Sequence, residues 1–366
     1  TGSSPNKPIP FSGVARMFKQ HREEFLDAVD RVGSSGQLLN GSYTSEFELS
    51  IRQRTDRRYA IAVNGCSQAL LFTNLYYAAE KYARIMAMPA VSFVATLNAA
   101  ALSNFDTRYV DVDKHGLMNL DTIEEQMGDS TVINYVNLAG NMVDYNRLKL
   151  IITMFKSEQP IIEDAAQSFG AKIGEIPSGK AGTVSVLSFD PMKNLPAFNG
   201  GGMILTDDHD LARHALNLRD NGRQDGFTVA GTNSRMSEMD CACMLVKLKY
   251  FDQWQERRTQ IAHYYTSQLK DIVDTPSAMP NVTHAWSKYI IRSCDRTAIG
   301  KWLLDRGIEA KNNYTSPLYR FPHSPSPGSL RHANEFCAEN ISLPIYPELT
   351  DAEVESVADA ILDFYT

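Results

Sequence analysis

The chain contains 366 residues, of which 43% are hydrophobic and 22% are charged, and its formal net charge is -7. Because acidic and basic residues are interspersed and form no basic stripe, the composition argues against a nucleic-acid-binding surface. No uninterrupted apolar run of about 18 residues occurs, so we expect no membrane-spanning helix.

The length and the cysteine content narrow the class of protein. A chain of 366 residues exceeds the about 100 to 200 residues of one domain, so we expect a large and a small domain. Residues 1–5 lack the basic and apolar blocks of a signal peptide. The five cysteines are an odd number without disulfide-scaffold spacing, which favours reduced thiols and a cytoplasmic location. They are Cys66, Cys241, Cys243, Cys294 and Cys337.

Strand and helix patterns alternate through the first two thirds of the chain. Short apolar runs bounded by turn residues predict strands at 84–89, 108–111, 131–136, 161–163 and 184–189. Helical patterns lie near 94–103, 120–126 and 144–155. Such alternation is typical of an α/β fold with a mainly parallel sheet flanked by helices.

Sequence patterns in the last third of the chain predict a smaller α+β domain. A long helical pattern over 237–269, with or without a break, bridges to it. This domain contains an apolar segment at 286–291 and helices near 295–306 and 351–364. The Pro/Ser-rich stretch 321–328 predicts a surface loop. We therefore place a large domain at 8–250 and a small C-terminal domain at 251–366.

The segment around Lys193 carries the most informative pattern. Asp164 ends a short apolar run upstream of it, and three glycines at 200–202 follow it. Alone, such a lysine is usually a solvated charge and such an aspartate a helix cap. However, both follow predicted strands, whose carboxyl ends share the sheet edge where α/β proteins bind ligands. An amine and a carboxylate placed there suggest pyridoxal phosphate, which needs a Schiff-base amine and an acid at its ring nitrogen.

Several motifs occur in an order that identifies a family. The centre is the run from Glu163 to Gly170, followed by Ser188, Phe189 and Lys193. Further agreement lies at 62–70, 92–96, 233–238, 313–318 and 342–345. Over roughly residues 8 to 366 the chain resembles the DegT/DnrJ/EryC1/StrS sugar aminotransferases, a branch of the fold-type I pyridoxal phosphate enzymes.

The resemblance implies a role for each cofactor-binding residue. Lys193 forms the Schiff base and carries a proton during transamination, while Asp164 contacts the pyridine nitrogen. Backbone N–H groups before the helix that begins near Gln68 favour the phosphate. The residues expected at that turn are Gly65, Cys66 and Ser67.

The resemblance places four more residues around the cofactor. Phe93 matches an aromatic residue that stacks on one face of the ring, and Gln167 matches a residue near the other face. Ser188 matches a phosphate ligand. Asn233 matches an asparagine that reaches the phosphate of the neighbouring subunit, so the resemblance implies a homodimer with shared active sites.

The chain departs from the family pattern where the substrate is expected. Asn199 stands where the family commonly has glutamate, which removes a negative charge. Asn221 and Tyr319 stand where histidine is frequent. We take Asn199, Tyr314 and Tyr319 as candidate substrate-binding residues, and we expect no metal.

The sequence thus predicts a cytoplasmic, homodimeric aminotransferase that uses pyridoxal 5'-phosphate. It moves an amino group from L-glutamate, or less favourably glutamine, to a keto or aldehyde group of a sugar, for amino-sugar biosynthesis of cell-surface polysaccharide such as lipopolysaccharide, or a related product. Family precedent favours a nucleotide-linked sugar, and a non-nucleotide sugar or an eight-carbon sugar acid is the alternative. The dehydratase branch has histidine in place of the lysine, so Lys193 argues against it. A non-catalytic sensor or scaffold is the alternative from another class.

Overall fold

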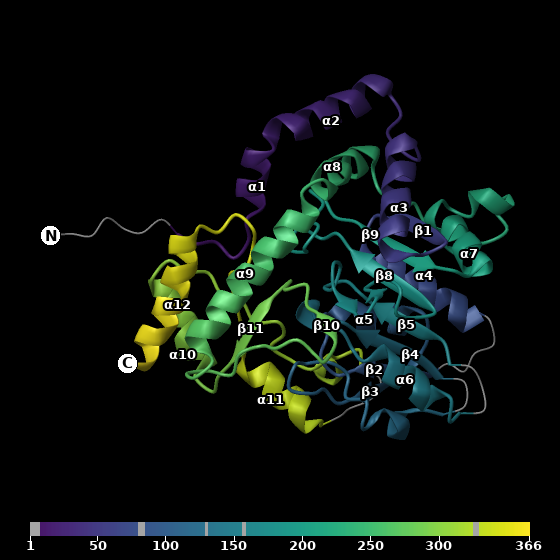
Figure 1. The fold of residues 1–366 in the computed structure, drawn as a ribbon. Helices are drawn as coiled ribbons and strands as arrows, with labels where there is room; N and C mark the ends of the chain where they lie inside the picture. The colour runs from purple at the N-terminus through teal and green to yellow at the C-terminus, as the bar shows by residue number, and fades with distance from the viewer. Residues whose placement is uncertain (1–7, 80–84, 129–130, 156–158, 325–328) are drawn as a thin grey trace.

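The computed structural model describes residues 8–79, 85–128, 131–155, 159–324 and 329–366 (Figure 1). Within these ranges the largest sheet has seven strands in the order β1-β9-β8-β5-β4-β2-β3. Every pair from β8 to β3 is parallel, whereas β9 is antiparallel to both β1 and β8. The strands are β1 (Tyr59–Val63), β2 (Ile85–Pro89), β3 (Asp106–Val110), β4 (Thr131–Val136), β5 (Ile161–Asp164), β8 (Val184–Ser188) and β9 (Gly202–Thr206).

Strands β4, β5, β8 and β9 consist entirely of buried residues. Continuous burial is expected for strands that are covered on both faces of a sheet. The strands predicted at 131–136, 161–163 and 184–189 are confirmed, and β2 and β3 match those predicted at 84–89 and 108–111, although Arg84 lies outside the described residues. Strands β1 and β9 are additions to the prediction.

Helices cover the sheet, with α4 packed on β8 and β9, α5 on β3, and α7 on β1 and β9. The predicted helices at 94–103 and 144–155 are confirmed as α5 and α6. The helix predicted at 120–126 is wrong, because only a short 3-10 turn forms there. Asn119 accepts hydrogen bonds from the Asp121 N–H and the Thr122 hydroxyl, which favours a turn over a helix. The elements are α4 (Cys66–Ala79), α5 (Val94–Leu102), α6 (Tyr145–Ile152), α7 (His209–Arg219), η1 (Ile123–Gln126), η2 (Leu138–Gly140) and η3 (Arg223–Asp225).

The N-terminal helices α1 (Val14–Gln20), α2 (Arg22–Ser35) and α3 (Ser42–Thr55) form an arm along one side of the molecule (Figure 1). Helices α2 and α3 both pack against α8 (Glu238–Leu248). Phe25 and Val32 of α2 are buried in a cluster with Val246 of α8. The arm is therefore anchored by apolar contacts to a helix that follows it by some two hundred positions.

The long helical pattern at 237–269 is confirmed with a break, because α8 ends at Leu248 and α9 (Phe251–Leu269) begins three positions later. Helix α9 leads to the C-terminal part, where β11 pairs with β12 in an antiparallel sheet. A separate small sheet has the order β10-β6-β7. The remaining elements are β6 (Lys172–Ile173), β7 (Ile176–Pro177), β10 (Val282–Thr283), β11 (Tyr289–Arg292), α10 (Arg296–Asp305), η4 (Leu318–Arg320), α11 (Arg331–Glu339), β12 (Asn340–Leu343) and α12 (Asp351–Tyr365).

The apolar core divides between these two parts of the chain. One cluster of buried residues surrounds the seven-stranded sheet, and another joins α9, α10, α12 and the β11–β12 sheet, including Tyr265, Tyr289 and Ile361. Predicted helices at 295–306 and 351–364 are confirmed as α10 and α12. Of the loop predicted at 321–328, residues 325–328 lie outside the described residues. Among the helices that the structure describes, none is long and apolar enough to cross a membrane.

Candidate active site

A cavity of about 420 Å³ lies at the carboxyl ends of β4, β5 and β8, where Val136, Asp164 and Ser188 reach it. Ligands bind at this edge in open α/β sheets. The cavity brings together ten of the residues predicted from the sequence. They are Gly65, Cys66, Ser67, Phe93, Asp164, Gln167, Ser188, Lys193, Asn199 and Tyr314.

Asp164 ends β5 and is only 3% exposed. Its Oδ1 accepts a hydrogen bond from the Ala166 N–H at 3.1 Å, and its Oδ2 accepts one from the Thr96 hydroxyl at 3.2 Å. Burial raises the pKa of this carboxyl, while the Ala166 N–H, the charge of Lys193 and the Thr96 hydroxyl act in the opposite direction. A buried carboxylate that lines a cavity is matched to a cationic group of a ligand.

Gly65, Cys66 and Ser67 form the entry to α4, whose first N–H groups have no acceptor within the helix. A Cβ added to Gly65 would meet no atom within 4 Å, so the backbone faces open space. A Cβ on Gly202 of β9 would lie 2.6 Å from the Cys66 nitrogen, so only glycine fits behind this turn. Burial raises the pKa of the Cys66 thiol, which keeps it uncharged. The turn thus offers backbone donors to an anion.

Phe93 precedes α5, and its side chain is 54% exposed although it is a large apolar residue. The Tyr314 ring lies 5.9 Å from it, between centroids. The Tyr314 hydroxyl accepts a hydrogen bond from Gln167 Nε2 at 3.1 Å, and burial raises the pKa of this hydroxyl. An exposed aromatic face that lines a cavity is suited to stacking on a planar ring.

Lys193 lies in the turn that follows β8. Its backbone N–H donates to the Asp190 carbonyl at 2.9 Å, and the next residue, Asn194, donates from its side chain to the Ala285 carbonyl at 2.7 Å. The Ser188 hydroxyl accepts from the Asp190 N–H at 3.3 Å. These bonds fix the turn, so the lysine side chain enters the cavity from a defined position.

Asn233 and Tyr319 do not line the cavity. Asn233 is exposed, and its side-chain oxygen accepts from the Arg235 guanidinium at 3.0 Å. Tyr319 is 6% exposed and packs edge-on against Tyr109, with ring centroids 5.8 Å apart. The structure therefore does not bring Tyr319 to the predicted substrate region, because η4 turns it into the core.

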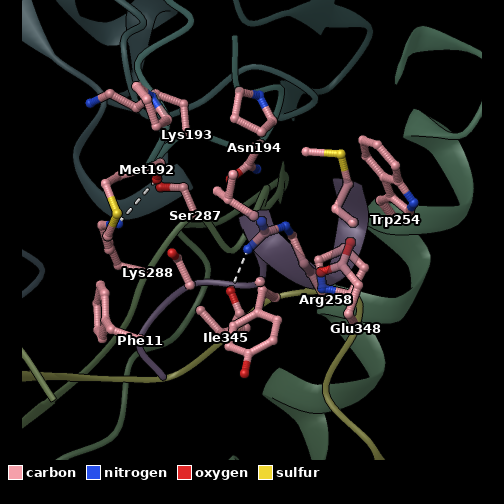
Figure 2. Close-up of a pocket in the computed structure, with 18 residues that line it drawn as sticks. Phe11, Met192, Lys193, Asn194, Trp254, Arg258, Ser287, Lys288, Ile345 and Glu348 are labelled. Atoms are coloured by element: carbon pink, nitrogen blue, oxygen red, sulfur yellow. Dashed lines mark hydrogen bonds between the residues drawn. The ribbon is translucent and has the colours of Figure 1, made fainter. Parts of the chain in front are cut away.

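Phe11, Lys288 and Lys311 are among the cavity residues that the sequence reasoning did not assign to the site. Figure 2 shows Phe11 and Lys288 near Lys193, at a second pocket that shares this wall. One sequence signal could have identified Lys288: it lies within the apolar segment 286–291, and a charged residue buried in such a segment needs a partner. Among the described residues, no group of three or more His, Cys, Asp or Glu could hold a metal ion.

The cavity residues fit pyridoxal phosphate. The turn before α4 offers donors for a phosphate, Asp164 offers a buried carboxylate for a protonated ring nitrogen, and Lys193 offers a primary amine. Phe93 and Gln167, the two residues expected at the faces of the ring, both line this cavity. The chain's own residues therefore supply each group that this cofactor requires.

The chain is similar to known proteins over almost its whole length. A pleiotropic regulatory protein of Geobacillus stearothermophilus is 30% identical, with 98% of each chain covered. A dTDP-3-amino-3,4,6-trideoxy-alpha-D-glucose transaminase of Streptomyces venezuelae is 27% identical, with 97% of this chain and 96% of that one covered. The crystal structure of NtdA from Bacillus subtilis with bound cofactor PMP has a TM-score of 0.87 at 25% identity, with 98% of this chain and 86% of that one covered. The model of the DegT/DnrJ/EryC1/StrS aminotransferase family matches residues 19–362, and the chain belongs to this family.

Proposed function

We propose that the protein is a pyridoxal phosphate-dependent aminotransferase that moves an amino group from L-glutamate to a keto or aldehyde group of a sugar. The observation that carries this proposal is the meeting of Lys193, buried Asp164 and the α4 turn in one cavity. When bound, the cofactor supplies an aldehyde carbon and an electron-accepting ring.

The chain's own residues provide the proton transfer and the charge stabilisation that the reaction needs. The Lys193 amine, once the donor's amine has displaced it, takes a proton from the donor's α-carbon as a general base. Asp164 favours a protonated ring nitrogen, which in turn offsets the cost of burying the carboxylate. Thr96 and the Ala166 N–H hold the carboxylate in place.

The proposal also includes the identity of the acceptor sugar and the oligomeric state of the protein. A nucleotide-linked sugar is the favoured acceptor, supported by the name of the Streptomyces transaminase, and amino-sugar biosynthesis for a cell-surface polysaccharide is the process it would serve. We further propose a cytoplasmic homodimer whose exposed Asn233 completes the partner's phosphate site. Residues 8–250 and 251–366 are proposed as its large and small domains.

The proposal is tested by loading the protein with pyridoxamine phosphate and adding keto-sugars one at a time. We expect a keto-sugar to restore the visible absorption of the pyridoxal form, and the sugar with a hydroxyl in place of the carbonyl to leave the spectrum unchanged. A panel of dTDP-linked, UDP-linked, phosphorylated and acidic keto-sugars identifies the acceptor. If neither 2-oxoglutarate nor any keto-sugar restores the absorption, transamination is contradicted and a non-catalytic role is favoured.

A further inference from the structure

Two lysine side chains line the cavity without a carboxylate partner among the described residues. Lys288 and Lys311 come from the C-terminal third, and both lie beside the ring of Phe11. The Lys288 nitrogen is 5.2 Å and the Lys311 nitrogen 5.1 Å from the centroid of that ring. The N-terminal segment thus places one aromatic ring against two cations.

Lys288 is 8% exposed, and its Nζ donates to the Met192 carbonyl at 3.3 Å, the contact drawn in Figure 2. Burial, followed by the charges of Lys193, Arg258 and Lys311, lowers the pKa of this amine to about 7, and Asp190 acts in the opposite direction. A buried cation surrounded by other cations is costly unless an anion pairs with it. Asp190 is the one negative group among the causes that act on this pKa, and no carboxylate among the described residues pairs with the Lys288 amine.

Lys311 is exposed, but its backbone is fixed. Its N–H donates to the Ser342 carbonyl at 3.2 Å and its carbonyl accepts from the Ser342 N–H at 2.6 Å, which ties it to β12. Asn313 and Tyr314, two and three positions later, also line the cavity. The flexible lysine side chain therefore starts from a rigid edge at the cavity wall.

The other charged groups that line the cavity are already accounted for. Asp164 faces the ring nitrogen and Lys193 the aldehyde carbon in the proposed reaction. Asp190 is exposed, and its Oδ1 accepts from the Met192 N–H at 3.0 Å. Besides Asp164 and Lys193, the cavity is thus lined by two lysines, Lys288 and Lys311, and one aspartate, Asp190, which already accepts a hydrogen bond within its own turn. The cavity therefore has an excess of positive charge that a substrate anion could neutralise.

We propose that Lys288 and Lys311 form an anion subsite that binds a carboxylate or phosphate group of the acceptor sugar. The inference rests on the proposed function, in which one cavity receives the amino donor and the acceptor in turn. A pair of cations at one wall suits both substrates when the acceptor, like glutamate, is acidic. The cofactor's own phosphate has separate donors at the α4 turn.

The test compares acidic and neutral sugars as ligands of the protein loaded with pyridoxamine phosphate. The probes are glucuronate and glucose 6-phosphate, with glucose as the neutral match, and the dissociation constants are measured by calorimetry. The wild type should bind at least one acidic sugar about tenfold or more tighter than glucose, because charge-assisted hydrogen bonds are stronger than neutral ones. Lys288→Met and Lys311→Met should each remove most of that preference, while Lys301→Met, an exposed lysine of α10, should keep it.

The other possible results of this experiment overturn the anion subsite or assign the lysines to another ligand. Equal affinities, no binding of either acidic sugar, or a preference that survives both substitutions overturns the subsite. If the substitutions weaken only the half-reaction with L-glutamate, the lysines serve the donor, and if they only release the cofactor, they serve its phosphate; both results overturn the assignment to the acceptor. Lys311→Met remains informative if Lys288→Met does not fold. The two proposals can also fail separately. If the preference for an acidic sugar depends on the lysines, but neither a keto-sugar nor 2-oxoglutarate converts the pyridoxamine form to the pyridoxal form, the subsite is supported and transamination is contradicted.

Discussion

Gln167 donates a hydrogen bond from its side-chain nitrogen to the Tyr314 hydroxyl at 3.1 Å, across 147 positions of sequence. Gln167 follows β5 of the large sheet, whereas Tyr314 follows α10. The orientation of the amide is fixed, because its oxygen accepts from the Ala139 N–H at 3.1 Å. The contact joins the two parts of the chain at the wall of the cavity.

Removing the Tyr314 hydroxyl should weaken catalysis. Tyr314→Phe leaves the ring beside Phe93 but takes away the acceptor of the Gln167 bond, so we expect kcat/KM to fall about tenfold. Tyr319→Phe is the matched control, since that hydroxyl hydrogen-bonds the Leu330 backbone and lies outside the cavity. A larger loss in Tyr319→Phe than in Tyr314→Phe would restore Tyr319 as a substrate-binding residue.

Asp164→Asn should preserve the shape of the side chain and lose the negative charge. We expect kcat to fall about 100-fold or more, because the ring nitrogen is no longer held protonated. The measurement is the single-turnover rate with L-glutamate, with cofactor content checked by absorbance. A rate near that of the wild type would show that Asp164 is not the partner of the ring nitrogen.

Glu163, the neighbour of Asp164, provides the matched control. Its buried carboxylate accepts from the Ser185 hydroxyl at 2.6 Å and from the N–H groups of Gly179 and Ala181 at 3.1 and 3.0 Å. Glu163→Gln should therefore lower the free energy of unfolding by about 1 to 3 kcal/mol, because a donor replaces an acceptor in this network. Its kcat per folded molecule should stay within about twofold of the wild type, since the side chain lies outside the cavity.

The shared active site is tested by mixing two inactive chains. Lys193→Ala lacks the amine, and Asn233→Asp places a negative charge where the partner's phosphate is proposed. If the sites are shared, a mixed dimer contains one site with both native residues, and activity returns on subunit exchange. Should exchange be complete and activity stay at the level of the parents, Asn233 acts within its own chain.

The stability of the folded chain should depend on pH through the ion pair between Arg16 of α1, in the N-terminal arm, and Glu353 of α12. Both terminal nitrogens of the guanidinium contact the carboxylate, at 2.7 and 2.6 Å. This pairing, together with hydrogen bonds from the Thr350 N–H and hydroxyl, lowers the pKa of Glu353 from 4.5 to about 2. Because the folded pKa is depressed, the stabilisation is present above pH about 4.5 and is lost as the pH falls toward about 2.

The matching measurement is thermal unfolding at several pH values. Glu353→Gln should lower the free energy of unfolding by about 1 kcal/mol at pH 6, and the difference from wild type should shrink below pH about 4.5. Glu335→Gln, which breaks an exposed pair with Arg331, is expected to have no measurable effect. A difference for Glu353→Gln that stays constant down to pH about 3 would contradict the pairing.

The meeting of Asp164 and Lys193 at one cavity could be predicted because the information that places them is local. Asp164 and Lys193 each follow a buried strand, and parallel strands deliver such residues to the same edge. Lys288 and Lys311 reach the cavity only through the packing of the C-terminal part, which periodicity does not encode. Tyr319 lies five positions after Tyr314, yet the turn at η4 buries it against Tyr109.

Two features of the fold were also beyond the sequence patterns. Strands β1 and β9 are five-residue apolar runs, too short for periodicity to distinguish them from buried helix or loop. The start of β9 also depends on Gly202, where only glycine fits because the Cys66 backbone of another element lies against it. Such close contacts between distant segments are set by tertiary packing.

The most direct test of the central claim follows the visible absorption of the holoenzyme after L-glutamate is added. The wild type should lose its pyridoxal absorption and form one equivalent of 2-oxoglutarate per site, since the Lys193 amine both releases the cofactor to the donor and takes the donor's proton. Lys193→Ala, with its cofactor bound, should form at least about 1000-fold less 2-oxoglutarate in the same time. Formation of 2-oxoglutarate by Lys193→Ala at a few per cent of the wild-type rate or more, without an added amine, would contradict the account.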